Sequence, residues 1–402
     1  MQPKLTAQFH TNNRNTLRSK LSGKLPAIIA ANGLVQRTAD STFPFAQDSN
    51  FWYLTGVETP DAILVISETD DFVIVPGRSA VRQAFDGAND IEGITERSGI
   101  GAVLNEIQGW QYITDLVSSS KQASYLKPLS IYESSHGFYA NPARRRVGER
   151  LRRTQTSLTL HDIRTELAEL RCIKQPVEIG CIEAAVRTTK DTLAEITNSA
   201  DFANMQYEYE LEAAITSGFR KRGTTGHAYN PIVAGGSNAT TLHYDQNNAR
   251  IKPSDYIVVD VGAEVEHYAA DITRTLIQDK PSARQKAVYS SVDHLQKQAI
   301  AMLRPGMLMH EYEQRFERLM MTELLELGLI HDLRDRKGMR RYYPHATSHF
   351  LGLDVHDVGD YSQPLAENMV LTCEPGIYIP EESIGVRIED DLLITADGAR
   401  IL

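Results

Sequence analysis

Two aspartates in the middle of the sequence lie inside apolar, strand-like stretches. Asp260 follows an aromatic and β-branched run at 256–259, and Asp271 has similar neighbours after a polar turn at 262–266. An ionised carboxylate in such surroundings is costly unless something compensates its charge. The two side chains could face each other across a hairpin, either as ordinary strand-end aspartates or as a pair of metal ligands. This stretch alone leaves both interpretations open.

Three later stretches also place polar residues in apolar surroundings. Residues 344–357 hold three histidines, and such a group indicates a functional site more strongly than a single histidine does. Glu374 ends an apolar run immediately before a proline and a glycine. Residues 384–394 alternate with period two, which places Arg387 and Glu389 on the same face of a strand. Each stretch therefore adds candidate functional residues to the two aspartates.

Five of these side chains, from four separate strand-like segments, are candidate metal ligands: Asp260, Asp271, His349, Glu374 and Glu389. Four carboxylates and one imidazole suit manganese or cobalt better than a lone structural zinc ion. Four carboxylates also carry too much negative charge for one dication. Two metal ions about 3.5–4 Å apart, bridged by carboxylates and a hydroxide, would balance that charge. The pattern predicts metal-assisted hydrolysis.

Long helices and short strands are expected to position these residues. In the second half, the apolar periodicity predicts helices at 176–200, 207–222, 285–303 and 309–327, with strand-like runs between them. This half therefore predicts an α+β arrangement, with long helices beside an antiparallel sheet.

The first half predicts a separate α/β unit. An apolar run at 26–31 and a strand pair at 62–66 and 72–76 would supply its sheet. The aromatic stretch 43–56 is expected to be an ordered loop that packs locally.

A strongly basic segment, Arg144–Arg153, closes this half, and Pro142 marks the start of a helix there. Such a helix is either a solvated face or a binding surface for phosphates or an acidic partner. We expect two domains, at residues 1–165 and 166–402.

Composition limits the class of protein. The 402 residues are 42% apolar and 23% charged, as in ordinary folded proteins, and the net charge of −10 argues against nucleic-acid binding. Three cysteines are too few for a disulfide framework and fit a reducing compartment. No window approaches the ~18 apolar residues that span a bilayer, and the N-terminal segment has no signal-peptide core. We expect a cytoplasmic, soluble protein that binds neither nucleic acid nor membrane.

The second half resembles the "pita-bread" metallopeptidases, and within them the Xaa-Pro branch that contains aminopeptidase P and prolidase. The matching segments follow the family's order across about 170 to 402: 242–244, Asp260, 268–275, 348–359, 374–378 and 386–391. Their combination is specific, although each segment alone is weak. One departure is Ala270, where the family commonly has glycine. Residues 40–56 resemble the family's N-terminal domain, and they are closer to aminopeptidase P than to prolidase.

The resemblance implies an α+β fold with an N-terminal α/β creatinase-like domain and a C-terminal pita-bread catalytic domain. It also implies metal roles for the five candidate ligands. Asp260 would hold one metal ion, and Asp271 and Glu389 would bridge both. His349 and Glu374 would complete the shell of the second ion.

Further roles follow from the resemblance for residues around the metals. Glu374 would also carry a proton for the bridging hydroxide. His243 and His356 would line the proline pocket or steady the tetrahedral intermediate, and His345 would contact the scissile region. Tyr378 and Arg387 would bind substrate or support the metal ligands.

The function implied is a dinuclear peptidase that releases the N-terminal residue from peptides with proline in second position. A strict Xaa-Pro dipeptidase (prolidase) is the alternative. A non-catalytic pita-bread binding module and metal-free, creatinase-like hydrolysis are less favoured. We expect two divalent ions per chain, manganese with cobalt or zinc as alternatives, and a homodimer or higher homo-oligomer.

Overall fold

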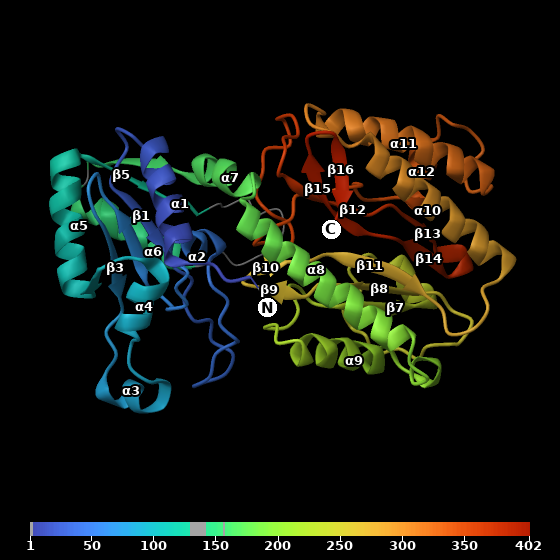
Figure 1. The fold of residues 1–402 in the computed structure, drawn as a ribbon, viewed down its shortest axis with the longest axis horizontal. Helices are drawn as coiled ribbons and strands as arrows, with labels where there is room; N and C mark the ends of the chain where they lie inside the picture. Colours follow the sequence, from blue (N-terminus) through green and yellow to red (C-terminus); the bar gives the residue numbers. More distant parts are fainter. Residues whose placement is uncertain (1–2, 129–141, 156) are drawn as a thin grey trace. The chain divides into compact units, whose positions relative to one another are not determined.

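The structure is a computed structural model that describes residues 3–128, 142–155 and 157–402. Its elements are arranged as Figure 1 shows. Across these three ranges, no helix is both long enough and apolar enough to pass through a bilayer.

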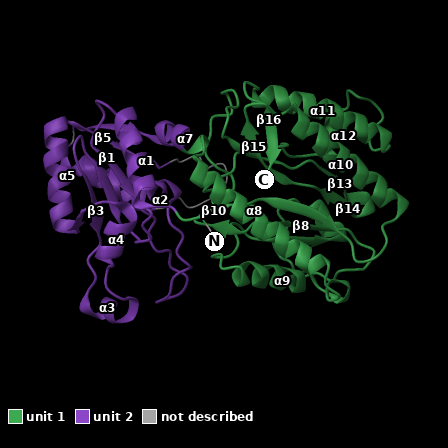
Figure 2. Ribbon diagram, in the orientation of Figure 1, with its two compact units in different colours: residues 1–4, 171–402 green, residues 5–170 purple. Residues whose placement is uncertain are grey.

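The chain divides into two compact units, which Figure 2 distinguishes by colour. The N-terminal unit comprises residues 5–170, and the C-terminal unit comprises residues 171–402 together with Pro3 and Lys4. The division falls within helix α7 (Arg164–Cys172), close to the boundary at residue 165 that we expect from the sequence.

The N-terminal unit contains a mixed six-stranded sheet in the order β4-β3-β2-β1-β5-β6. The strands are β1 (Ala27–Ala30), β2 (Ile63–Ile66), β3 (Asp71–Val75), β4 (Ala102–Asn105), β5 (Gln122–Tyr125) and β6 (Thr159–Asp162). β1, β2 and β3 form antiparallel pairs, whereas β3/β4, β1/β5 and β5/β6 are parallel. The predicted strand pair at 62–66 and 72–76 is confirmed. The helices, besides α7, are α1 (Ala7–Lys20), α2 (Ser49–Thr55), α3 (Ala80–Asp86), α4 (Ile91–Ser98), α5 (Glu106–Ser120) and α6 (Pro142–Thr154).

Helix α2 corrects the expectation that 43–56 is a loop throughout. The side chain of Asp48 caps its start by accepting hydrogen bonds from the backbone N–H groups of Asn50 and Phe51. Gly56, in the left-handed conformation at φ 64°, ends it. These two caps define a short buried helix that periodicity over so few residues does not reveal.

The basic helix α6 uses its arginines within the N-terminal unit. Arg144 pairs with Asp48, and Arg146 pairs with Asp61. The guanidinium of Arg150 lies over the ring of Trp110, 4.0 Å from its centroid. The helix is therefore neither a bare solvated face nor an open anion site over these positions.

The C-terminal unit combines several small sheets with long helices (Figure 1). The sheets are β11-β8-β7, β12-β15-β16, β13-β14 and β9-β10. Their strands are β7 (Ile232–Gly235), β8 (Ile257–Val261), β9 (Glu264–Val265), β10 (Tyr268–Ala269), β11 (Ile272–Leu276), β12 (Val370–Cys373), β13 (Gly376–Ile379), β14 (Ile384–Arg387), β15 (Asp390–Thr395) and β16 (Gly398–Ile401).

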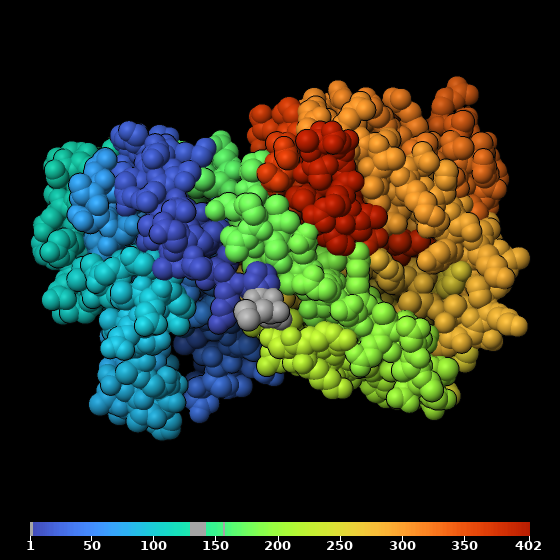
Figure 3. Space-filling model, viewed as in Figure 1, coloured from blue at the N-terminus to red at the C-terminus, as the bar shows by residue number. Residues whose placement is uncertain are grey.

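The four predicted long helices of this unit are confirmed as α8 (Pro176–Thr197), α9 (Glu208–Lys221), α10 (Ala283–Met302) and α11 (Met309–Glu326), and α12 (Arg336–Tyr342) follows them. α8 contacts β9, β10 and β11, and α9 contacts β7, whereas α10 packs on β12, β13, β14 and β16. Figure 3 shows the red C-terminal residues beside the green α8, where Lys190 Nζ donates a 2.7 Å hydrogen bond to Leu402 O.

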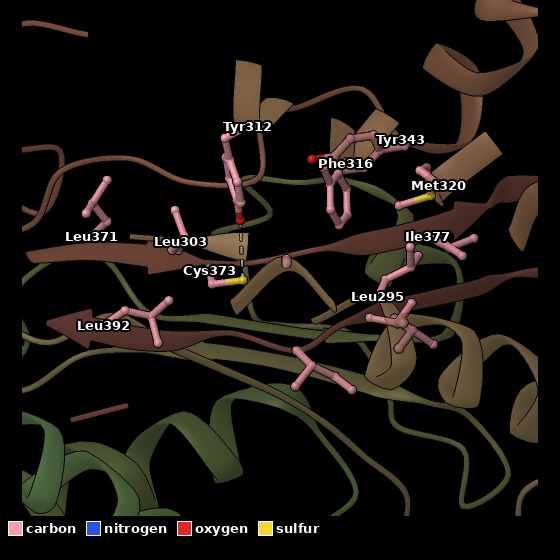
Figure 4. Packing of buried hydrophobic residues seen from close by; sticks show 14 of the residues in the cluster. Leu295, Leu303, Tyr312, Phe316, Met320, Tyr343, Leu371, Cys373, Ile377 and Leu392 are labelled. Atoms are coloured by element: carbon pink, nitrogen blue, oxygen red, sulfur yellow. Dashed lines mark hydrogen bonds between the residues drawn. The ribbon is translucent and has the colours of Figure 1, made fainter. Parts of the chain in front are cut away.

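A hydrophobic core behind the second sheet joins α10 and α11 to the strands that carry two candidate ligands. Leu295, Phe316 and Leu371 are fully buried members of this core (Figure 4). The hydroxyl of Tyr312 lies 3.8 Å from Cys373 Sγ, at the end of β12 (Figure 4). The packing holds the end of β12 in place, directly before Glu374.

A buried ion cluster links the start of the C-terminal unit to its histidine-rich segment. Arg171 and Lys174 both pair with Asp357, at 2.5 and 2.9 Å, and the Lys174 and Asp357 side chains are each only 1% exposed. Burial alone would raise the pKa of Asp357, but the charges of Arg171 and Lys174 bring it below its ordinary value. Because Asp357 follows His356, this cluster fixes the backbone that carries a predicted catalytic histidine.

We predict that Asp357→Asn lowers the free energy of unfolding of the C-terminal unit by about 3–5 kcal/mol, because it removes the carboxylate that pairs with buried Lys174 and leaves Arg171 paired with Asp354. Far-UV circular dichroism in urea measures this. Tryptophan fluorescence would miss it, since both tryptophans, Trp52 and Trp110, lie in the N-terminal unit.

The stabilisation that Asp357 provides depends on pH. Because the folded-state pKa of Asp357 is depressed, its stabilisation is present at neutral pH and is lost as the pH falls below about 4. The difference between Asp357→Asn and the natural chain should shrink in acid. Asp397→Asn, at an exposed turn, is the control that should change nothing. Equal unfolding free energies for Asp357→Asn and Asp397→Asn would contradict this account.

Candidate metal centre

The first two candidate ligands lie on neighbouring strands. Asp260 is in β8, opposite Thr273 of β11, and Asp271 immediately precedes β11. The connection between them is more than a turn, since β9 and β10 pair within it. A Cβ at Gly262 would lie 1.7 Å from the carbonyl oxygen of Ala270, so only glycine permits this close approach. The two aspartates therefore lie side by side, as the sequence predicts.

A tyrosine joins the two aspartates. The hydroxyl of Tyr229 lies 2.5 Å from Asp260 Oδ1 and 2.6 Å from Asp271 Oδ1. Burial, and then the charges of Asp260 and Asp271, raise the pKa of Tyr229 well above its ordinary value, so the phenol stays protonated. One hydroxyl has one hydrogen and donates to only one carboxylate at a time. Whichever of the two aspartates does not receive this hydrogen therefore needs another positively charged partner.

His349 approaches the carboxylates with a free lone pair. One ligand atom each from Asp271, His349 and Glu389 lies within 4.8 Å of the others. His349 Nε2 is 3.4 Å from Asp271 Oδ2 and 3.5 Å from Glu374 Oε1. Its Nδ1 lies 3.0 Å from the carbonyl oxygen of Phe350, which can only accept, so Nδ1 carries the hydrogen. Nε2 is thus left as the metal-binding atom.

Two buried carboxylate oxygens at this centre have no hydrogen-bond partner in the described part of the chain: Glu389 Oε1 and Asp391 Oδ1. The other oxygen of each is engaged. Thr273 Oγ1 donates to Glu389 Oε2 at 2.6 Å, and the backbone N–H of Asp271 donates to Asp391 Oδ2 at 3.0 Å. Buried acceptors without donors call for a cation.

Arg387 and Tyr378 border the carboxylates on one side. Arg387 donates from Nη2 to Asp260 Oδ2 at 2.5 Å, from Nε to Thr273 Oγ1 at 3.0 Å and from Nη1 to the Tyr378 hydroxyl at 3.1 Å. The Tyr378 hydroxyl also lies 2.9 Å from His345 Nε2. Three predicted substrate-binding residues, His345, Tyr378 and Arg387, therefore form one connected chain beside the candidate ligands.

The electrostatics fit a cation at this place. Burial is the largest cause that raises the pKa of Asp271, Glu374 and Glu389 well above ordinary carboxyl values, and neighbouring carboxylates raise each further. The positive charge of Arg387 opposes this but does not cancel it. Carboxylate oxygens with one imidazole are the donors that hard and borderline divalent ions prefer. The residues present fit a divalent metal site.

The two remaining histidines differ in position. His356 lies against His349, with ring centroids 4.2 Å apart, and burial followed by the charge of His349 lowers its pKa to about 4. His243 is exposed, in the segment after β7, but its charge reaches both His345 and His356. Their catalytic roles remain predictions.

A buried glutamate anchors the segment that carries His243. Glu208 Oε1 accepts from the backbone N–H of Gly235 at 2.8 Å and from Asn238 Nδ2 at 3.0 Å. Its Oε2 accepts from the Tyr244 hydroxyl at 2.8 Å. The glutamate therefore organises the segment on both sides of His243.

With this geometry in place, comparison with known proteins defines the class. The chain belongs to metallopeptidase family M24, whose sequence profile matches residues 180–396. The profile of the aminopeptidase P N-terminal domain matches residues 10–125. Membership implies divalent metal ions at the candidate centre. The two-domain α+β fold expected from the sequence is confirmed.

Individual relatives cover nearly the whole chain. The Xaa-Pro aminopeptidase of Haemophilus influenzae is 34% identical over 391 residues, which are 91% of this chain and 87% of the relative. Escherichia coli aminopeptidase P with the inhibitor Pro-Leu superposes with a TM-score of 0.84 at 29% identity, covering 99% of this chain and 95% of that chain. Proline aminopeptidase P II from Yersinia pestis also gives 0.84, at 30% identity, covering 99% and 96%.

Sequence reasoning missed three polar residues of the centre: Tyr229, Thr273 and Asp391 as an acceptor for Asp271. Thr273 carried a usable signal, because in the Asp-Ile-Thr run it lies two residues after Asp271 and so shares a strand face with it. Tyr229 carried none, since it lies in an irregular segment far from both aspartates in sequence.

We predict that Tyr229→Phe weakens metal binding roughly 10- to 100-fold, as removal of a hydrogen-bond partner of metal ligands generally does. Titration of the chelator-treated protein with manganese measures this. Tyr209→Phe removes a hydroxyl from an exposed ring and serves as the matched control. Unchanged affinity in Tyr229→Phe would show that the hydroxyl does not support the ligands.

Proposed function

We propose that this protein is an Xaa-Pro aminopeptidase, a metallo-exopeptidase that releases the N-terminal residue from peptides with proline in second position. The observation that carries this is the cluster of Asp271, His349 and Glu389, whose ligand atoms lie within 4.8 Å of one another, in a chain whose relatives of that name match over nearly its full length. Proline explains the need for a dedicated enzyme, because its fixed φ and missing N–H exclude it from common protease clefts.

The alternatives have less support. Prolidase shares the catalytic fold, but the relatives and solved structures that match this chain are Xaa-Pro aminopeptidases and aminopeptidases P. A non-catalytic binding module would be expected to have lost metal ligands. Metal-free hydrolysis would not require a cluster of buried carboxylates, two of whose oxygens have no hydrogen-bond partner in the described part of the chain.

We infer two divalent ions per chain, with manganese as the preferred metal. Asp271 and Glu389 would contribute to holding both ions, Asp260 would help to hold one, and His349 and Glu374 would help to hold the other. This assignment is supported by the number of carboxylates, whose charge exceeds what one dication balances. Bound metal would polarise the scissile carbonyl and lower the pKa of a bound water.

The chain's own residues would position the substrate and move the proton. Glu374 Oε2 lies 3.8 Å from His345 Nδ1. The Glu374 carboxylate would accept a proton from the attacking water and pass it to the leaving amine. His356 and His243 would stabilise developing charge on the substrate. Tyr378 and Arg387 would hold His345 and Asp260 in position.

We further propose a cytoplasmic homo-oligomer that binds neither nucleic acid nor membrane. The cysteines, Cys172, Cys181 and Cys373, are all free and buried, which supports a reducing compartment. Helix α3 buries none of its residues, and Val81 and Phe85 are 67% and 84% exposed. It forms a projection of the N-terminal unit (Figure 1, Figure 3), and such apolar exposure supports a partner surface.

We predict a metal content near two per chain and activity that a chelator abolishes. Asp271→Ala and Glu389→Ala should each lose metal and activity together, because each removes a bridge. His356→Ala is the matched control: it should retain metal while kcat falls roughly 10²- to 10³-fold. Elemental analysis with steady-state kinetics measures both. Hydrolysis that resists chelation would overturn the proposal.

We also predict that Xaa-Pro-Yaa tripeptides and longer peptides are cleaved, not Xaa-Pro dipeptides alone. A dipeptide site must pair the substrate's free carboxylate with a cation, since burying it unpaired is costly. Arg387, the guanidinium at this centre, is already engaged by Asp260 and Tyr378. Assays of both substrate classes with manganese decide the point. Cleavage confined to dipeptides would favour prolidase.

A further inference from the structure

A small pocket lies beside the candidate metal centre, on the same strands. Its volume is about 300 Å³, and it is lined by Tyr256 just before β8, by Thr275 in β11 and residues that follow that strand, and by the first turns of α10. This is within the range of sites that bind small molecules. None of the residues proposed for catalysis or metal binding lines it.

The pocket and the metal centre share one face of the β8–β11 pair. Side chains alternate along a strand, so Tyr256 in the pocket and Asp260 at the centre point the same way, roughly 13 Å apart along the strand. On the paired strand, Thr275 lines the pocket, and Thr273 contacts Glu389. A ligand in the pocket would therefore lie end to end with the metal centre.

Two of the polar side chains that line the pocket, Tyr256 and Lys286, can donate hydrogen bonds to a ligand. Tyr256 is only 4% exposed, and it lines the pocket. Burial, followed by the charge of Tyr289, raises the pKa of Tyr256, which keeps the hydroxyl protonated. Lys286 lines the rim and makes no ion pair within the described chain. No carboxylate is among the described residues that line the pocket. Such a lining favours the binding of an anion.

The walls of the pocket are apolar. Ile277 and Pro281 form one part, and the rings of Tyr256 and Tyr289, with centroids 6.2 Å apart and planes at 51°, form another. These surfaces suit a small planar or aliphatic body. A zwitterionic amino acid suits them poorly, because nothing acidic would pair with its ammonium group.

Hydrogen bonds from Thr275 to the backbone of Arg387 connect the pocket lining to a residue of the metal centre. Thr275 Oγ1 donates to the backbone oxygen of Arg387 at 2.9 Å and accepts from its backbone N–H at 3.1 Å. Arg387 in turn donates to Asp260. A ligand that contacts Thr275 therefore acts on the residue that holds one candidate metal ligand.

We propose that this pocket is an effector site for a small monocarboxylate with an apolar body, and that its occupancy changes catalysis through Thr275 and Arg387. The carboxylate lies between Lys286 and the Tyr256 hydroxyl, and the apolar body lies against Ile277 and Tyr289. The binding itself does not depend on which peptide the enzyme cleaves.

Benzoate is the probe, and calorimetric titration of the manganese-loaded full chain measures its binding. Lys286→Met and Tyr256→Phe should each weaken binding roughly tenfold or more, because each removes one donor to the carboxylate. Lys297→Met, on the same helix but paired with Asp293 outside the pocket, should bind as the natural chain does. Benzamide, the neutral analogue, should bind much more weakly.

Three results would overturn the site: no benzoate binding at tens of millimolar, binding that both pocket variants leave unchanged, or equal binding of benzamide. Benzoate bound only at the metals would give the second result, since neither variant touches the proposed ligands. Circular dichroism confirms that the variants fold.

The coupling has its own test. Saturating benzoate should change kcat/KM by about fivefold or more in the natural chain and in Lys297→Met. Lys286→Met should keep the basal rate but lose the response. A response that persists in Lys286→Met, or benzoate binding in the pocket without any response, would overturn the coupling.

Discussion

The mutual repulsion of buried carboxylates is the constraint on which the rest of the structure depends. Asp260, Asp271, Glu374 and Glu389 meet in one place from different strands, and burial and repulsion raise the pKa values of the last three. Neither Tyr229, with one hydrogen to share, nor Arg387, which engages Asp260, satisfies them all. A divalent cation would balance the negative charges of these carboxylates. It would also supply the metal chemistry that peptide hydrolysis needs.

The remainder of the C-terminal unit holds the carboxylates in place despite their repulsion. The core around α10 and α11 fixes the end of β12 before Glu374. The Arg171–Lys174–Asp357 cluster anchors the segment of His356, and Glu208 anchors that of His243. Each anchor is itself buried and held by ion pairs or hydrogen bonds, so contacts outside the centre keep its carboxylates in place.

The sequence was most informative where charged residues lie in otherwise apolar, strand-like stretches. Carboxylates in apolar runs stand out because burying them is costly, and the four carboxylate ligands were predicted this way, whereas His349 was predicted from the group of three histidines. Tyr229 could not be predicted, since it lies in an irregular segment and its partners are distant in the chain. Helix α2 was missed because two capping residues, rather than periodicity, define it. Long-range pairing, as between Arg171 and Asp357, is invisible without the fold.

The most direct test of the central claim is the melting temperature of chelator-treated protein compared with Glu389→Gln. Removing one charge should relieve the repulsion, so the metal-free variant should melt at a higher temperature than the metal-free natural chain. Manganese should then stabilise the natural chain strongly and the variant little. A metal-free variant that melts at a lower temperature, or equal stabilisation of both by manganese, would contradict the account.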